Sequence, residues 1–317
     1  MNTSGIGFLA AFAATLVAGT GAAPARAEPA SCGQPRFSDV GWTDITATTA
    51  TAALVLKSLG YTPKVNLLSL SATLASMKDK NIDVFLGNWM PSMEGDFRPY
   101  LDGKSVTQLR ANLEGAKYTL AVPAYAYDAG LKDFKDIARF ASDLGGKIYG
   151  IEPGNDGNRH ILDMINANTA GLGKFKIVES SEQAMLAEVA RAYKARKPIV
   201  FLGWEPHPMN KMFQMRYLTG GDDTFGPNYG GAAVFTTVRA GYAAECPNVG
   251  KLLQNMSFTL AMENELMGSI LNDKMDPTEA ARKYLKANAA MLEPWLDGVT
   301  TRDGAPALPA AKASLGL

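Results

Sequence analysis

Short apolar runs alternate with helical patterns through most of this 317-residue chain. Runs such as IDVFLG at 82–87 and PIVFLG at 198–203 have the length and composition of buried strands. Their alternation with helical patterns is typical of an α/β protein with parallel sheets. The pattern predicts strands at 36–41, 62–70, 82–87, 118–125, 147–150, 174–178, 198–203 and 232–238. It predicts helices at 46–59, 72–80, 134–144, 159–168 and 181–195, with a mainly helical remainder.

The first 27 residues are typical of a cleavable secretory signal. An uncharged apolar stretch at about 6–19 is followed by the small-residue run Ala25-Arg26-Ala27, so we expect cleavage before Glu28 and export of the protein. The usual basic residue near the start is missing, which leaves an uncleaved membrane anchor as the alternative. No other segment approaches the roughly 18 consecutive apolar residues of a spanning helix.

The chain has two cysteines, Cys32 and Cys246. In an oxidising compartment an even pair favours a disulfide over a metal site or a reactive thiol. Such a bond would join the N-terminal segment to a region near the last quarter of the chain.

The strand and helix series around residues 120–230 is self-contained, whereas the expected disulfide joins the two ends of the sequence. This combination predicts a discontinuous lobe I over 28–119 and 232–317, with lobe II over 120–231 inserted into it. Two extended crossings, near 118–122 and 229–237, would connect the lobes. Two lobes with two crossings form a hinged cleft, because few contacts cross between them.

Three of the four tryptophans, Trp42, Trp89 and Trp204, each follow a probable strand and a nearby glycine. In open parallel sheets, ligands bind outside the carboxyl ends of the strands, so these rings are expected to converge on a cleft. The alternative is that each ring fills a lobe core. Clustered aromatic faces either stack on sugar rings or enclose a quaternary ammonium group by cation–π attraction.

Two polar residues indicate that the ligand is a cation with a hydroxyl group. Asp44 follows Trp42 by two residues, and Asn155 lies in a loop at 152–158 that precedes a predicted helix. A carboxylate beside aromatic walls attracts a cation, repels the carboxylate of a zwitterion and accepts a hydrogen bond from a hydroxyl group. For Asp44 the alternative is an N-cap of the helix that follows.

Charge and histidine content argue against other functions. Lys plus Arg and Asp plus Glu number 31 each, so the net charge is zero and a nucleic-acid partner is not expected. His160 and His207 stand alone, without the spacing of metal ligands, and the glycines at 150–157 depart from a dinucleotide-binding loop. We therefore expect no metal site, no cofactor and no catalytic residues.

Five segments of the sequence resemble a known family. They are GWTDI at 41–45, FLGNWMPSM at 85–93, AKYTLAVP at 116–123, EPGNDGN at 152–158 and FLGWEPHPMN at 201–210. With them, nearly the whole mature chain resembles the substrate-binding proteins of glycine betaine and choline ABC importers, and within that class the periplasmic choline-binding proteins.

The resemblance implies a two-lobed periplasmic binding protein fold of type II, with the ligand cleft between the lobes. It implies an aromatic box of Trp42, Trp89, Tyr118 and Trp204 around a trimethylammonium group, with Asp44 and Asn155 holding the hydroxyl of choline. The implied partner is an inner-membrane permease with its ATPase, to which the exported, periplasmic protein would deliver choline. Binding of this kind needs no covalent chemistry, so no enzymatic activity is expected, and a monomer is the default expectation. The weak start of the signal sequence is the one departure from the family pattern.

Two other functions stay open at this point. The first is a glycine betaine or proline betaine binder with the same aromatic box, which would need donors for a ligand carboxylate. The second is an exported carbohydrate-active enzyme in which Asp44 and Glu205 would form the carboxylate pair.

Overall fold

The computed structural model describes residue 1 and residues 28–317. The expected signal sequence and its cleavage site at Ala27 lie outside the described residues. Among the residues that are described, no helix has the length and apolarity needed to cross a membrane.

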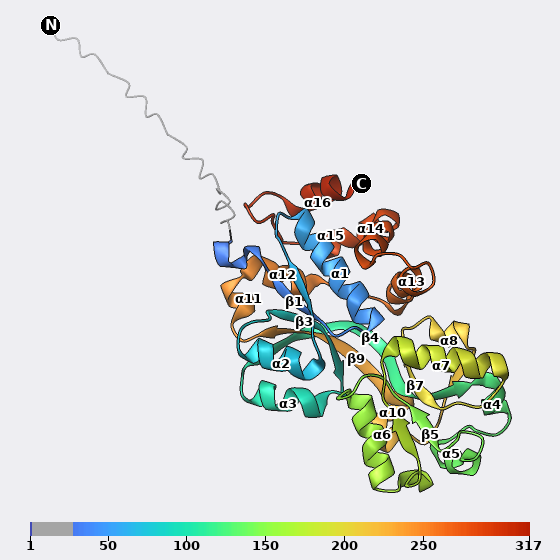
Figure 1. The fold of residues 1–317 in the computed structure, drawn as a ribbon. Helices are drawn as coiled ribbons and strands as arrows, with labels where there is room; N and C mark the ends of the chain where they lie inside the picture. The colour runs from blue at the N-terminus through green and yellow to red at the C-terminus, as the bar shows by residue number, and fades with distance from the viewer. Residues whose placement is uncertain (2–27) are drawn as a thin grey trace.

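One curled sheet of nine strands runs through the whole protein (Figure 1). The strand order is β2-β1-β3-β9-β4-β7-β5-β6, with β8 also paired to β4. The strands are β1 Arg36–Asp39, β2 Lys64–Leu67, β3 Val84–Met90, β4 Val106–Pro123, β5 Lys147–Tyr149, β6 Lys176–Val178, β7 Phe201–Glu205, β8 Met215–Tyr217 and β9 Gly231–Arg239.

The sheet is mixed, which corrects the expectation of purely parallel sheets. Strands β2, β1 and β3 are parallel to one another, and so are β7, β5 and β6. Between these two parallel sets lie β9 and β4, which run antiparallel to each other and to their outer neighbours. Each parallel set is therefore the core of one lobe, and the antiparallel strands join them.

Strand β4 reaches across both lobes. It pairs with β9 from Val106 to Lys117 and with β7 from Lys117 to Ala121. The two crossings that the sequence predicts lie on β4 and on the start of β9, and the exact lobe bounds stay a prediction. The sequence did not reveal the first twelve residues of β4, because three register shifts against β9 break the alternation of buried and exposed residues that marks a strand.

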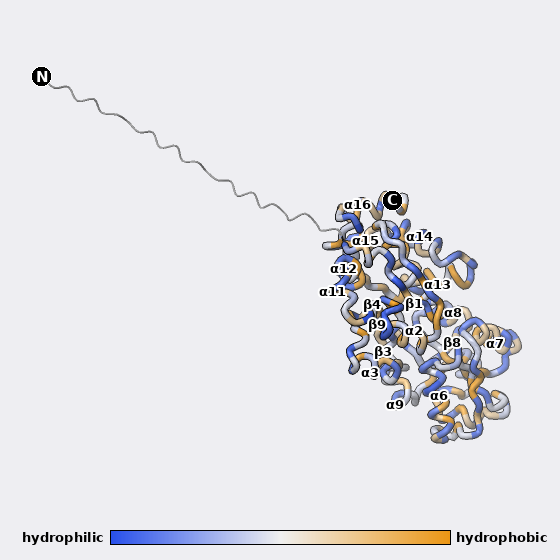
Figure 2. Tube along the Cα trace, turned by 60° about the vertical axis from the view of Figure 1, so that its left-hand side comes forward, coloured by the Kyte–Doolittle hydropathy of each residue, from blue (hydrophilic) through white to orange (hydrophobic). Residues whose placement is uncertain are grey.

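Helices cover the sheet in two groups, one around each parallel set of strands (Figure 1), and Figure 2 shows the same chain from another side. Around β1 to β3 lie α1 Thr43–Ser58, α2 Leu70–Lys78, α3 Glu94–Asp102, α11 Tyr242–Glu245, α12 Pro247–Asn255, α13 Leu260–Leu271, α14 Pro277–Ala287, α15 Leu292–Trp295 and α16 Ala307–Leu315. Around β5 to β8 lie α4 Ala124–Asp128, α5 Phe134–Ile137, α6 Asp156–Asn166, α7 Glu182–Ala195, α8 Met209–Met212, α9 Asp222–Phe225 and α10 Pro227–Gly230.

Helix α1 is the buried centre of its lobe. It packs against α13, α14 and α16, and most of its side chains are buried, which agrees with its Ala- and Leu-rich sequence. The helix begins at Thr43, three residues earlier than predicted, and this places Asp44 inside its first turn. The charged helix α3 was not predicted, because it contains Pro99 and buries only Phe97.

The predicted disulfide is confirmed. Cys32 and Cys246 are bonded, with their Cα atoms 5.5 Å apart and 214 residues between them in sequence. The bond fastens the short 3-10 helix at Ala30–Gly33 to the end of α11. Both ends of the described chain therefore belong to the same lobe.

Removing this bond is expected to destabilise the protein. A double substitution, Cys32→Ser with Cys246→Ser, should lower the free energy of unfolding by about 2–5 kcal/mol, because the unfolded chain regains the freedom of a very long loop. Denaturant unfolding of the variant and the oxidised wild type measures the difference. Equal midpoints and slopes would show that the bond adds nothing to stability.

Candidate functional site

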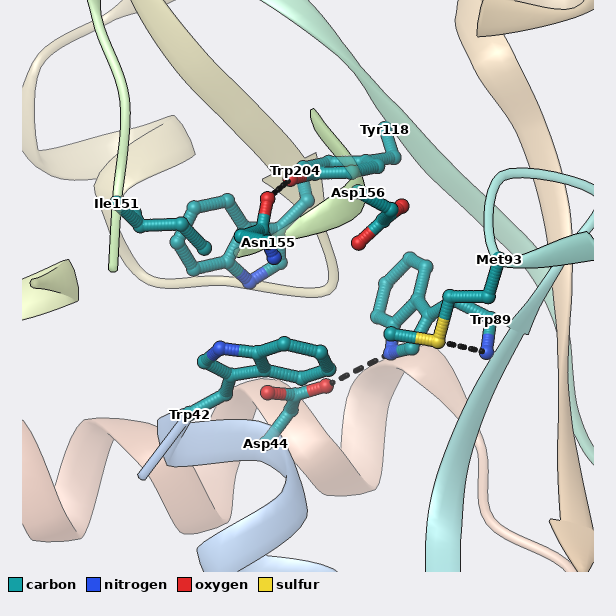
Figure 3. A pocket seen from close by; sticks show the side chains of 9 residues that line it. All are labelled: Trp42, Asp44, Trp89, Met93, Tyr118, Ile151, Asn155, Asp156 and Trp204. Carbon is teal, nitrogen blue, oxygen red and sulfur yellow. Dashed lines mark hydrogen bonds between the residues drawn. The ribbon is translucent and has the colours of Figure 1, made fainter. Parts of the chain in front are cut away.

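All six residues predicted for the ligand site line one cavity between the lobes (Figure 3), and the space that is free of protein atoms there, open solvent at its mouth included, is about 300 Å³. Its nine lining residues come from both lobes and from β4 between them. They are Trp42, Asp44, Trp89, Met93, Tyr118, Ile151, Asn155, Asp156 and Trp204. Three of these residues were not predicted as site residues: Met93, Ile151 and Asp156. They lie inside or next to the five sequence motifs, but no pattern in the sequence marked them individually.

Four aromatic rings form the walls of the cavity. In Figure 3 the Trp42 ring lies below the open space, Tyr118 and Trp204 lie above it, and Trp89 closes one side. The Tyr118 ring centroid lies 6.1 Å from that of Trp89 and 6.3 Å from that of Trp204, at interplanar angles of 57° and 77°. Because neighbouring rings are steeply inclined, their faces surround a volume instead of stacking on one another.

The strand ends place these rings, with one correction to the prediction. Trp42 follows β1 after a turn in which Gly41 has a φ of 85° and donates its N–H to Asp39. Trp89 and Trp204 are the next-to-last residues of β3 and β7, so they lie inside these strands and not beyond them. They still occupy the carboxyl ends of parallel strands, where ligands bind in α/β sheets.

Hydrogen bonds hold the polar atoms of three rings. The indole Nε1 of Trp42 donates to Glu152 at 2.8 Å, and the indole Nε1 of Trp89 donates to Asp44 at 3.2 Å. The hydroxyl of Tyr118 donates to Asn155 Oδ1 at 2.7 Å. With these groups satisfied, the rings offer their π faces to a ligand.

Asp44 is a buried acid with a free oxygen. Its Oδ2 accepts the bond from Trp89, whereas its Oδ1 is buried without a hydrogen-bond donor among the described residues. The N-cap alternative is wrong, because Trp42 is the N-cap residue of α1. Burial raises the pKa of Asp44 to about 8, and the charge of Glu182 adds to this effect. A cation in the cavity would relieve both causes.

Asn155 does cap a helix, and this fixes its orientation. Its Oδ1 accepts the backbone N–H groups of Gly157 and Asn158 at the start of α6, in addition to the hydroxyl of Tyr118. Three donors on one oxygen identify that atom as the carbonyl oxygen. The Nδ2 amide carries two N–H groups. One is directed toward Glu152, whose pKa is raised by burial and lowered in part by this hydrogen bond, and the amide keeps a second donor for a ligand.

Asp156 adds a second carboxyl group to the lining. It is buried and accepts a hydrogen bond from Ser92, and its burial raises its pKa above the ordinary range. None of the nine lining residues is basic. The cavity is thus apolar on its walls and acidic at its polar end.

The remaining residues of interest lie elsewhere. Glu205 forms an ion pair with Lys117 at 2.9 Å and is absent from the cavity lining, so it does not pair with Asp44. His160 packs against Phe225, and His207 lies beside Glu182. Neither histidine has another histidine or a cysteine near it in the sequence.

A two-lobed α/β fold that encloses a ligand-sized aromatic cavity defines a solute-binding protein. Residues 36–287 match the family described as the substrate binding domain of ABC-type glycine betaine transport systems. The chain belongs to that family.

Solved structures agree with this assignment. A structure described as an ABC-transporter choline binding protein in complex with choline is 64% identical, with a TM-score of 0.90 over 91% of this chain and 100% of that one. The protein described as the same binding protein in an unliganded semi-closed conformation gives a TM-score of 0.84 at 64% identity, over 90% and 100% of the two chains. Lactococcal OpuAC, complexed with glycine betaine, is 26% identical with a TM-score of 0.75, over 83% and 98%.

Proposed function

We propose that this protein captures choline in the cavity and delivers it to an ABC importer. The observation that carries the proposal is a box of four aromatic rings with one buried, unpartnered carboxylate oxygen. The similarity of the whole chain to a choline-binding protein at 64% identity supports it. The family membership makes an inner-membrane permease with its ATPase the partner, and we infer a monomer that works in the periplasm.

The trimethylammonium group of choline fits the walls. A cation against a desolvated aromatic face gains about 2 kcal/mol, and Trp42, Trp89, Tyr118 and Trp204 supply four such faces. After the costs of ordering the ligand and closing the lobes, a micromolar dissociation constant, near 8 kcal/mol, is a reasonable expectation. Binding of this kind requires no covalent step, so we infer a binder and not an enzyme.

The hydroxyl of choline fits the polar end. Asp44 Oδ1 lacks a donor, and a hydroxyl group would supply one. The Nδ2 amide of Asn155 is free to donate to the hydroxyl oxygen. These two residues together would satisfy both hydrogen-bonding functions of an alcohol.

Glycine betaine is the second candidate, favoured by the family description and by the lactococcal neighbour. A betaine carboxylate in this cavity would meet the buried acids Asp44 and Asp156 and no basic side chain. In their ionised forms, which a quaternary ammonium cation favours, these acids would repel the betaine carboxylate strongly in a desolvated site. The carbohydrate-active enzyme has less support, because Glu205 does not line the cavity with Asp44.

Loss of one wall should weaken choline binding without unfolding the protein. Trp204→Ala removes a cation–π face, so titration calorimetry should give an affinity lower by about tenfold or more. Trp204→Phe keeps an aromatic face and should lose clearly less. Unchanged affinity in Trp204→Ala, with an unchanged circular dichroism spectrum, would reject the aromatic box.

Choline affinity should rise with pH. In the closed, empty protein burial raises the pKa of the Asp44 carboxyl to about 8, and the permanent cation of choline favours the ionised form, so binding to this state below that pH releases a proton. Affinity should therefore increase from about pH 6 to about pH 8 and then level off. The charged groups that face Asp44 are Glu182 on α7 and Glu263 on α13.

Calorimetry at several pH values, in buffers with different ionisation enthalpies, measures both the affinity and the released proton. Asp44→Asn is the matched control: it should bind more weakly at high pH and lose most of the pH dependence. A pH profile that is the same in the wild type and in this variant would show that another group carries the proton.

A further inference from the structure

The carboxylate of Glu182 connects the two lobes beside the cavity without lining it. Glu182 is the first residue of α7 and is 1% exposed. Its Oε2 accepts the backbone N–H of Thr43 at 2.8 Å, and its Oε1 accepts the Thr43 hydroxyl. Thr43 is the first residue of α1, in the other lobe. The first turns of two helices from different lobes therefore meet at one buried carboxylate.

This contact supplies a cap that α1 lacks on its own. The first N–H groups of a helix have no intrahelical partner, and an acidic side chain near them is also favoured by the helix dipole. Trp42, the N-cap residue of α1, makes no capping hydrogen bond through its side chain. Because Glu182 belongs to the other lobe, α1 is capped in this way only while the lobes are closed.

A second residue supports the carboxylate from the side of lobe II. His207 Nδ1 accepts the backbone N–H of Met209 at 3.0 Å, which places the ring proton on Nε2. That Nε2 lies 3.3 Å from Glu182 Oε1 and donates to it. The His207 ring also packs edge-on against Trp204, with the ring centroids 5.0 Å apart.

A continuous series of contacts thus runs from one wall of the cavity to the opposite one. It starts at Trp204 and passes through His207 and Glu182 to Thr43. Thr43 is flanked in sequence by Trp42, a wall of the cavity, and by Asp44, its buried acid. Whatever holds Thr43 against Glu182 also holds these two neighbours at the distance from Trp204 that encloses a ligand.

We propose that Glu182 is a positioning residue that latches the lobes closed over the ligand. The proposal rests on the proposed function of the cavity as a site for a quaternary ammonium ion. In the open protein, water solvates the carboxylate and the first turn of α1. On closure both lose that water, and the donors of Thr43 and His207 replace it; a buried carboxylate with such partners is costly to disrupt.

A partly exposed ion pair between the lobes should have a smaller effect on closure than Glu182. Arg159 forms a two-bond ion pair with Asp96 at 2.8 and 2.9 Å, but both side chains are partly exposed. Ion pairs in contact with water contribute little, because solvent screens them and ordering long side chains is unfavourable. Glu182 is buried, bonded to backbone and close to two walls, so it should have the larger effect on closure.

A latch acts mainly on the lifetime of the complex. The hydrogen bonds between Glu182 and Thr43 do not touch the ligand, so loss of these bonds, with the charge of Glu182 kept, lowers the population of the closed state for every ligand by the same factor. The association step precedes closure and should change little. This behaviour separates Glu182 from Asp44, whose substitution should alter the preference among ligands.

The experiment compares Glu182→Gln with wild type by stopped-flow tryptophan fluorescence. The substitution keeps the shape of the side chain, removes its charge and replaces one acceptor oxygen. We expect the choline dissociation rate constant to rise about tenfold or more, with the association rate constant within about twofold of wild type. Glu188→Gln, two turns further along α7 and partly exposed, is the matched control and should leave both constants unchanged.

A second variant keeps the proposal testable if Glu182→Gln does not fold. Thr43→Val removes the hydroxyl donor and leaves the backbone N–H in place. It should therefore also raise the choline dissociation rate constant, by a smaller factor than Glu182→Gln. In a double-mutant cycle, the effects of Thr43→Val and Glu182→Gln should be clearly less than additive, because both remove the same contact.

The same rate constants are measured with glycine betaine. The latch can then be tested even if the wild type binds only one of the two ligands. Absence of choline binding by the wild type counts against the proposed function and not against the latch. Two results would overturn the latch. The first is a dissociation rate in folded Glu182→Gln equal to that of wild type. The second is a change in the ratio of choline to betaine affinity in Thr43→Val, which keeps the charge of Glu182, because that would mean that the contact acts on the ligand and not on closure.

Discussion

Burial of acidic groups without a basic partner is the constraint on which this site depends. Asp44 is enclosed by aromatic rings and keeps one carboxylate oxygen without a donor. Glu263, beneath it on α13, is also buried, and burial together with the charge of Asp44 raises its pKa well above the ordinary range. A closed and empty cavity therefore holds acids that cannot all ionise, whereas a monovalent cation stabilises their charged forms. A cationic ligand would therefore supply the positive charge that these buried acids lack.

The sheet explains how one cavity receives residues from distant parts of the sequence. Strand β4 pairs with β9 in one lobe and with β7 in the other, and it carries Tyr118 at the point where its partner changes. Trp89 on β3 and Trp204 on β7 then approach from the two sides. The polar atoms of Trp42, Trp89 and Tyr118 are hydrogen-bonded to side chains of the protein, so recognition relies on ring faces. Faces attract a cation from any direction, which suits a trimethylammonium group that has no hydrogen-bond donors.

Much of this arrangement could be predicted from the sequence, because it depends on local signals. Glycine–tryptophan motifs at strand ends identified the walls, and two cysteines in an exported chain identified the disulfide. The cap geometry could not be predicted. Asp44 has the residue type of an N-cap, but α1 begins at Thr43 because Glu182, 139 residues away, supplies the capping carboxylate. The mixed sheet was also missed, since bulges in β4 hide its periodicity.

The measurement that tests the central claim most directly is a calorimetric comparison of choline with its uncharged carbon isostere, in which a quaternary carbon replaces the nitrogen. The two ligands have nearly the same shape and the same hydroxyl group, and they differ in charge. If the aromatic box and Asp44 recognise the cation, choline should bind at least about a hundredfold more tightly, the effect of about 3 kcal/mol or more of cation–π and carboxylate attraction. Equal affinities would contradict the account, because they would show that the cavity selects shape and apolar surface alone.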